Sequence, residues 1–206
     1  MMYGLPNLLT ISRIAAIPVV MGAFYLPGTW ANWVAVLLFA LASLTDLLDG
    51  YLARSWNQTS KLGRFLDPVA DKLLVASTLL MLTHFNWIDG WSIVPALVIL
   101  CREIMVSGLR EFLAELKVGV PVSRLAKWKT AIQMLAIGLL IFHPAAPDWL
   151  PVHGIGIVGI WVAAGLTLVT GYDFLRAGLR HMTGPAAAPA AESPAARPAA
   201  RAEARR

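Results

Sequence analysis

The sequence predicts an all-α integral membrane protein with six transmembrane helices and with both termini in the cytoplasm. Hydrophobic residues make up 58% of its 206 residues and charged residues only 14%, a composition typical of a chain whose surface faces lipid. Apolar segments recur along the chain, and most approach the roughly 20 residues that a helix needs to cross a bilayer. Lys and Arg residues gather in alternate connections between these segments, as they do in multi-pass membrane proteins.

The six predicted helices follow the apolar segments in chain order. They lie at residues 8–26, 31–52, 65–85, 91–113, 131–142 and 152–175. The fifth segment is short, so we expect residues 125–130 to form its first turns. The sequence GIGIVG at 154–159 matches a dinucleotide-binding pattern, but it begins an apolar run instead of following a strand. We therefore interpret its glycines as helix-packing residues.

The positions of the cations predict the orientation in the membrane. The connections at 26–30, 84–91 and 143–154 contain no Lys or Arg, whereas the other two connections and the C-terminal region are rich in both. Because cytoplasmic segments of membrane proteins carry the excess of positive charge, both termini are predicted to be cytoplasmic. The net charge of +5 is explained by these segments, so we expect no nucleic-acid partner.

The C-terminal residues predict a separate region. The sequence GPAAAPAAESPAARPAARAEARR has almost no large apolar side chain and contains repeated prolines, so it has little with which to form a core. The chain is thus expected to divide into a six-helix membrane catalytic domain at 1–183 and a disordered tail rich in Ala, Pro and Arg at 184–206.

Four aspartates lie close together at the predicted cytoplasmic ends of the second and third helices. Asp46 and Asp49 are three residues apart, and Asp67 and Asp71 are four apart, so each pair shares one face of its helix. Four carboxylates at short range repel one another and are costly near hydrocarbon, so a positive partner must compensate them. Nearby Lys and Arg residues could do so as ordinary ion pairs. Oxygen ligands in this number also suit two Mg²⁺ or Mn²⁺ ions, which would imply a phosphate substrate.

The same stretch resembles a family signature. It reads Asp46-x2-Asp49-Gly50-x2-Ala53-Arg54-x8-Gly63-x3-Asp67-x3-Asp71. This pattern is similar to the signature of the CDP-alcohol phosphatidyltransferases, with every position filled. The resemblance implies a six-helix membrane enzyme, usually a homodimer, that binds CDP-diacylglycerol and transfers its phosphatidyl group to an alcohol with release of CMP.

The resemblance also implies roles for the signature residues. Asp46, Asp49 and Asp67 are expected to be metal ligands, and Asp71 is expected to be the general base while also lying beside a metal. The residues expected to line the cytidine nucleotide are Gly50, Ala53, Arg54 and Gly63. The expected cofactor is a pair of Mg²⁺ or Mn²⁺ ions. A site at the cytoplasmic ends of the helices suits this reaction because the lipid headgroup meets a soluble acceptor there.

Basic residues outside the signature indicate a site for an anionic acceptor. Arg102 and Glu103 lie near the middle of the predicted fourth helix, and charges at that depth are usually paired and turned inward. Arg110 is eight residues beyond Arg102 and lies on nearly the same face, while Lys127 and Lys129 lie at the start of the fifth helix. A cluster of this kind suits an anion, although the positive-inside distribution also explains part of it.

A narrower resemblance covers nearly all of residues 1–180. The segments PNLLTISRIAAIP, YLARSWNQTSKLGRFLDPVADKLLV, CREIMVSGLREF and KWKTAIQM are similar to bacterial members of the family whose acceptor is sn-glycerol 3-phosphate. One departure is Ala126, where a glycine commonly stands. This resemblance implies a location in the bacterial inner membrane, with the active site facing the cytoplasm.

The narrower resemblance also implies an acceptor site. Arg110 and Lys129 are the first candidates to bind the phosphate of glycerol 3-phosphate, and Arg13 and Lys127 are further candidates. Asn7 and Thr10, in the amino-terminal segment, are expected to contact the headgroups. Asn7 is expected to bind the CDP-lipid, and Thr10 is expected to bind the acceptor.

Two alternatives stay open. One keeps the chemistry and changes the acceptor, for example to inositol phosphate or serine. The other belongs to a different class, a divalent-cation channel or carrier, because carboxylates at a helix end can also form an ion path. Against the second alternative, the outer halves of the predicted helices contain no matching ring of acidic residues.

Overall fold

A computed structural model describes residues 5–56, 61–115 and 124–183 of the chain. Within these ranges, the side chains of residues 5–10, 46–56, 61–65, 67, 115, 124, 177 and 180–183 lie outside the description, as does the predicted tail at 184–206. The described residues form helices and no strand. The helices are α1 (Leu5–Ala23), α2 (Thr29–Trp56), α3 (Lys61–His84), η1 (Gly90–Ser92), α4 (Ile93–Glu115), α5 (Arg124–Phe142), η2 (His143–Ala145) and α6 (Val152–Thr183).

Each predicted helical segment corresponds to one of these α-helices. The fifth begins at Arg124, so the expected first turns at 125–130 are helical. The second and sixth helices continue several residues past the predicted ends, to Trp56 and Thr183. Pro68 lies in the interior of α3 and not in its first turn. The all-α prediction is therefore confirmed at the level of the helices.

Three segments of the described chain are long and apolar enough to cross a membrane. They are Gly90–Ala114, Leu125–Ala145 and Val152–Arg176. Two shorter apolar helical segments, Ile11–Ala23 and Thr29–Thr45, occur in α1 and α2. Length and composition thus support membrane insertion most directly for α4, α5 and α6.

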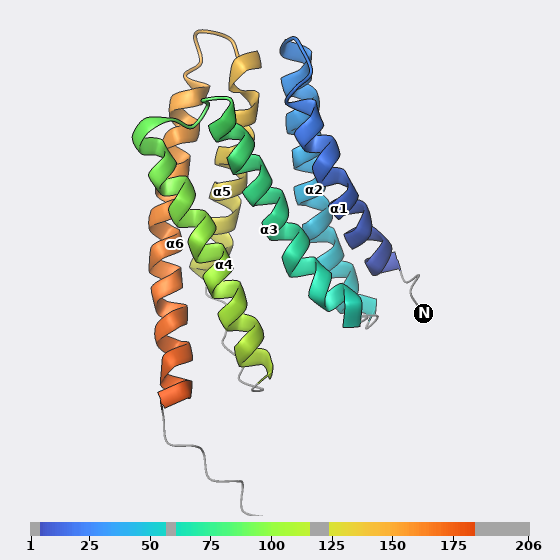
Figure 1. Cartoon of the computed structure of the whole chain (residues 1–206), viewed down its shortest axis with the longest axis vertical. Coiled ribbons are helices and arrows are strands. Elements are labelled where there is room, and N and C mark those ends of the chain that lie inside the picture. Colours follow the sequence, from blue (N-terminus) through green and yellow to red (C-terminus); the bar gives the residue numbers. More distant parts are fainter. Residues whose placement is uncertain (1–4, 57–60, 116–123, 184–206) are drawn as a thin grey trace, which may run out of the picture.

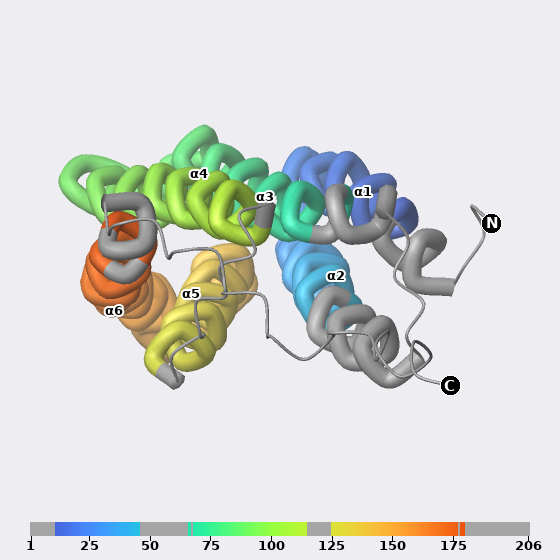
Figure 2. The backbone as a smooth tube through the Cα atoms, turned by 90° about the horizontal axis from the view of Figure 1, so that it is seen from below, coloured from blue at the N-terminus to red at the C-terminus, as the bar shows by residue number. Residues whose placement is uncertain are grey.

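The helices form an elongated bundle of two rows. Seen along the bundle, α4, α3 and α1 make one row and α6, α5 and α2 make the other (Figure 2). α1 packs on α2 and α3, and α6 packs on α4 and α5. Figure 1 shows the connections α1–α2, α3–α4 and α5–α6 at one end of the bundle, opposite the end where α1 begins and α6 ends.

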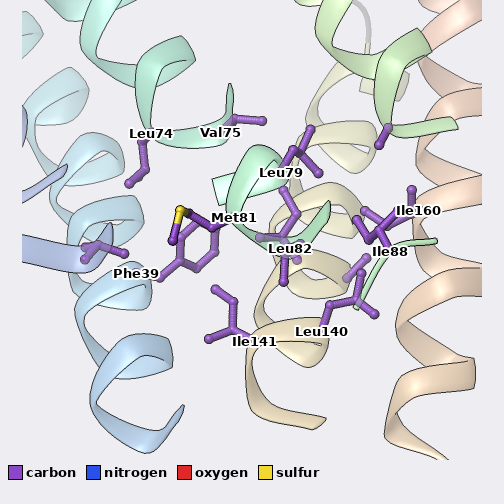
Figure 3. Close-up of a cluster of buried hydrophobic side chains, with 14 of the residues drawn as sticks. Phe39, Leu74, Val75, Leu79, Met81, Leu82, Ile88, Leu140, Ile141 and Ile160 are labelled. Carbon is purple, nitrogen blue, oxygen red and sulfur yellow. The ribbon is translucent and has the colours of Figure 1, made fainter. Parts of the chain in front are cut away.

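A cluster of buried apolar side chains joins the two rows. Figure 3 shows Leu79 and Leu82 of α3 among side chains from α2, α5 and α6, including Phe39, Leu140 and Ile160. These five side chains are almost completely buried. Because lipid tails are as apolar as leucine, close packing of such side chains contributes more to helix association in a membrane than their removal from water does.

Two glycines of the GIGIVG segment, Gly156 and Gly159, pack α6 against α5, as predicted. A Cβ atom added at Gly159 would lie 2.7 Å from the Cβ of Ala136, and one added at Gly156 would lie 2.7 Å from the Cγ of Leu140. Neither position has room for a side chain. The absence of side chains therefore permits the close approach of these two helices.

Aromatic contacts hold together the end of the bundle that carries the three connections. The rings of Phe24 and Trp87 stack with centroids 5.5 Å apart, which joins the α1–α2 and α3–α4 connections. The rings of Trp33 in α2 and Phe142 in α5 meet edge to face with centroids 4.6 Å apart. Asn32 adds a hydrogen bond from its side-chain amide to the carbonyl oxygen of Ile141, at 3.2 Å. We call this end of the bundle the aromatic end.

Candidate functional site

A cavity of about 1340 Å³ lies among α2, α3, α4 and α5. Its wall is mostly apolar in one part and charged in another. One part, which we call the apolar half, is lined by α2 between Trp33 and Leu44 and by α5 between Met134 and Phe142. The other part, which we call the polar half, carries the charged residues Asp71, Lys72, Arg102, Glu103, Arg110, Glu111, Lys127 and Lys129. A cavity of this kind suits a ligand that has both an apolar and a charged portion.

The polar half brings together residues that are far apart in the sequence. Asp71 comes from α3, Arg110 from α4, and Lys127 and Lys129 from α5. Each was a candidate site residue from the sequence, and the structure places all four in the wall of one cavity. Five cations face three carboxylates in this half. The excess of positive charge favours an anionic ligand.

The remaining signature residues lie in helices, with side chains outside the description. Asp46, Asp49, Gly50, Ala53 and Arg54 belong to the last turns of α2, and Gly63 and Asp67 to the first turns of α3. Both helices are continuous through these positions, as the three- and four-residue spacings require. The predicted roles of these residues stay predictions.

Asp71 is the one predicted metal ligand whose side chain the structure describes. It is half-buried and lines the polar half of the cavity, one helical turn after Asp67 in a continuous α3. Among the described side chains there is no group of three or more His, Cys, Asp or Glu residues that could hold a metal ion. The side chains of the other three aspartates, Asp46, Asp49 and Asp67, are not among the described ones. The predicted donor set, four carboxylates in two helices, would suit Mg²⁺ or Mn²⁺, which prefer oxygen ligands.

Of the predicted residues of α1, Arg13 is the one whose side chain the structure describes. The side chains of Asn7 and Thr10 are outside the description. Arg13 is buried, with 2% of its surface exposed, and no residue of α1 is among the described residues that line the cavity. Its predicted contact with an acceptor phosphate stays a prediction.

An ion pair between α4 and α5 crosses the polar half. The ammonium of Lys129 donates to the Oε1 atom of Glu103, and Lys129 is buried while Glu103 is half-buried. The expectation that charges in the middle of the fourth helix are paired and turned inward is confirmed for Glu103. The sequence did not identify its partner, because helical spacing places a residue on a face without saying which helix that face contacts.

The two arginines of α4 contact α6. Arg102 donates from Nη2 to the hydroxyl oxygen of Thr170 at 2.9 Å. The guanidinium carbon of Arg110 lies 5.5 Å from the ring centroid of Phe174, within the range of a cation–π interaction. Sequence reasoning missed both α6 partners, since a threonine or a phenylalanine in an apolar helix gives no signal of its own.

These features define a helical protein with an amphipathic cavity suited to an anionic lipid, and the comparisons with known proteins agree. The sequence pattern of the CDP-alcohol phosphatidyltransferase family matches residues 3–169. The chain belongs to this family.

Three similar bacterial proteins are each named CDP-diacylglycerol–glycerol-3-phosphate 3-phosphatidyltransferase. The one from Rickettsia bellii is 48% identical over 174 residues, covering 84% of this chain and 94% of the relative. The one from Pectobacterium atrosepticum is 40% identical over 189 residues, covering 90% and 100%. The one from Cereibacter sphaeroides is 38% identical over 217 residues, covering 88% and 98%.

A solved structure shares the fold. It is the phosphatidylinositol phosphate synthase of Mycobacterium tuberculosis in complex with manganese and citrate, with a TM-score of 0.60, 21% sequence identity, and coverage of 84% of this chain and 82% of the other. Together with the bacterial relatives, the three long apolar helices identify this chain as an integral membrane protein.

Proposed function

We propose that the protein transfers the phosphatidyl group of CDP-diacylglycerol to sn-glycerol 3-phosphate, giving phosphatidylglycerophosphate and CMP, in phospholipid biosynthesis. The observation that carries this proposal is the cavity whose wall has one polar and one apolar half. Membership of the family and the shared name of the relatives support the same reaction.

The lipid substrate matches the two halves of the cavity. Its acyl portion would lie in the apolar half, between α2 and α5, where Trp33 and Phe142 meet at the far end. Its charged headgroup would then reach the polar half, toward Asp71. The nucleotide would lie against the last turns of α2 and the first turns of α3, near Gly50, Ala53, Arg54 and Gly63, with Asn7 as a further contact.

The acceptor matches the cations of the polar half. Arg110 and Lys127 are exposed in the cavity wall, so they can reach a soluble phosphate. Lys129 is buried in its pair with Glu103, and would contribute its charge from a fixed position. Arg13 and Thr10 are further candidates on α1. A phosphate between a guanidinium and ammonium groups gains charge-assisted hydrogen bonds.

In the proposed reaction, Asp71 acts as the proton acceptor. The carboxylate would take the proton of the acceptor hydroxyl as that oxygen attacks the phosphorus that carries diacylglycerol. The bond from this phosphorus to the bridging oxygen then breaks, and CMP leaves with that oxygen. Two Mg²⁺ or Mn²⁺ ions, held by Asp46, Asp49, Asp67 and Asp71, would offset the charge of the pyrophosphate. The manganese in the M. tuberculosis structure supports divalent ions in this family.

The proposed location is the bacterial inner membrane. The protein would cross it with six transmembrane helices, with both termini and the active site on the cytoplasmic side, and would form a homodimer.

Cysteine labelling tests the orientation in the membrane. In a Cys101→Ser background, Asp148→Cys in the α5–α6 connection should react with a membrane-impermeant maleimide on intact spheroplasts. Arg176→Cys, near the end of α6, should react only after the membrane is permeabilised. The reverse pattern would reject the orientation.

The reaction is tested by CMP release from detergent-purified protein. CDP-diacylglycerol is supplied with Mg²⁺ or Mn²⁺, and glycerol 3-phosphate is compared with inositol phosphate, with serine and with no acceptor. We expect release only with glycerol 3-phosphate, and loss of release when EDTA removes the metal. Release with another alcohol would keep the family chemistry and reject the acceptor. Folded protein that releases no CMP with any of these acceptors, and instead carries divalent ions into liposomes, would reject the enzyme.

A further inference from the structure

The side chain of Arg102 lies in a recess of α6 that only glycine allows. A Cβ atom added at Gly171 would lie 2.9 Å from the Nε atom of Arg102 and 3.0 Å from its Cγ atom. Gly171 is itself buried. Any side chain at position 171 would therefore push the stem of Arg102 away from α6.

Thr170 holds the other end of the same side chain. Its hydroxyl donates to the carbonyl oxygen of Leu166 at 2.8 Å, one turn back in α6. With its proton used in this way, the oxygen presents a lone pair to Nη2 of Arg102, at 2.9 Å. Only 5% of Thr170 is exposed, so water does not compete readily for this acceptor.

Arg102 lies beside the residue that pairs with Lys129. Arg102 and Glu103 are adjacent in α4, and Arg102 is within electrostatic range of Glu103. A guanidinium that left α6 would compete with Lys129 for this carboxylate. In the structure the two contacts are separate: Arg102 reaches α6, whereas Glu103 reaches Lys129 on α5.

The same arrangement affects the cavity. Arg102, Glu103 and Lys129 all line its polar half, and the charges of Asp71 and Arg102 both act on the ammonium of Lys129. Among the described residues of the cavity wall, none belongs to α6. Thr170 and Gly171 can therefore influence the cavity through Arg102, the residue they hold.

We propose that Thr170 and Gly171 are positioning residues for the acceptor phosphate. By holding Arg102 against α6 they keep Glu103 paired with Lys129, so that the cations of the polar half stand where the phosphate of the acceptor binds. This inference rests on the proposed function, because it assigns these residues to the binding of glycerol 3-phosphate and not of the CDP-lipid.

Three variants and two matched controls separate positioning from packing. Thr170→Val removes the acceptor at nearly constant volume, and Thr170→Ser restores it. Gly171→Ala fills the recess. Matched controls come from the same helix: Thr167→Val changes a buried threonine one turn away, and Gly165→Ala adds a methyl group where no atom lies within 4 Å.

The test is CMP release at saturating CDP-diacylglycerol with varied glycerol 3-phosphate, and then with the substrates exchanged. We expect Thr170→Val and Gly171→Ala to raise the KM for glycerol 3-phosphate about tenfold, the order expected when a hydrogen bond to a charged group is lost. The KM for CDP-diacylglycerol should stay within about twofold of the wild-type value, as should both constants in Thr170→Ser and in the two controls.

A second readout does not need turnover. Glycerol 3-phosphate should raise the midpoint of thermal unfolding of the wild-type protein, and this rise should shrink in Thr170→Val and Gly171→Ala but not in the controls. Equal losses for both substrates, failure of Thr170→Ser to restore the KM, or an unchanged KM in both test variants would overturn the positioning role. Wild-type protein that neither turns over nor binds glycerol 3-phosphate would instead reject the proposed function, and the inference with it.

Discussion

Removing the carboxylate of Glu103 should destabilise the protein more than removing its partner. The side chain of Lys129 is 5% exposed, whereas that of Glu103 is 20% exposed and faces the cavity. Glu103→Gln leaves an ammonium buried without its carboxylate, and such a loss typically costs about 3 to 5 kcal/mol. Because the charge of Asp71 also acts on Lys129, we expect a value near 3 kcal/mol.

The reverse variant leaves a better-solvated charge. In Lys129→Met the carboxylate of Glu103 can turn toward water in the cavity, so we expect a cost of about 1 to 2 kcal/mol, below the range for fully buried pairs. The double variant removes both charges and should be closer to wild type than Glu103→Gln alone. Replacement of a buried pair by uncharged side chains is often nearly neutral.

The assay is the free energy of unfolding in mixed detergent micelles, measured by titration with a denaturing detergent and followed by helical circular dichroism. A double-mutant cycle gives the coupling between the two residues, which we expect to be favourable and at least about 1 kcal/mol. Strictly additive effects, or a larger cost for Lys129→Met than for Glu103→Gln, would refute this account of the pair.

Three further predictions concern the site and the packing. Asp71→Asn should abolish CMP release but keep much of the binding of metal and CDP-diacylglycerol, as measured by calorimetry; wild-type turnover would exclude Asp71 as the base. Arg110→Ala should raise the KM for glycerol 3-phosphate more than that for CDP-diacylglycerol, and an unchanged acceptor KM would move the phosphate site elsewhere. Gly159→Ala should lower the free energy of unfolding by about 1 to 3 kcal/mol, because its new methyl group would meet Ala136. Gly154→Ala, with no atom within 4 Å of the added Cβ, should cost less, and equal costs would contradict the packing argument.

The helices were predictable because their apolar segments are long and their spacing is regular. Even the short fifth segment could be extended correctly to begin near Arg124, since a spanning helix needs more residues than the apolar run supplies. The place of Pro68 was not predictable. A proline is tolerated in a first turn and also in a membrane helix whose freed backbone groups find other partners, and the sequence does not choose between these cases.

The site was predictable only in part, for a similar reason. Periodicity put Arg102 and Arg110 on one face of α4, and the structure places both in the cavity wall. It could not show that Arg102 reaches Thr170, 68 residues later, or that Glu103 reaches Lys129, 26 residues later. Helical periodicity fixes the face of a residue, whereas its partner depends on how the helices are arranged. The arrangement follows from features such as Gly171, which look ordinary in the sequence.

The two halves of the cavity favour one orientation of the proposed lipid substrate. At the aromatic end, α2 and α5 are joined by the contacts of Trp33 with Phe142 and of Asn32 with Ile141. Toward the other end the walls become charged, with Asp71 from α3 and Arg110 from α4. A lipid in this cavity therefore has one favourable orientation, with its acyl portion toward the aromatic end, because the reverse orientation would place a pyrophosphate among apolar side chains. That orientation would bring the phosphate to be attacked toward Asp71, the carboxylate that is proposed to take the proton of the acceptor.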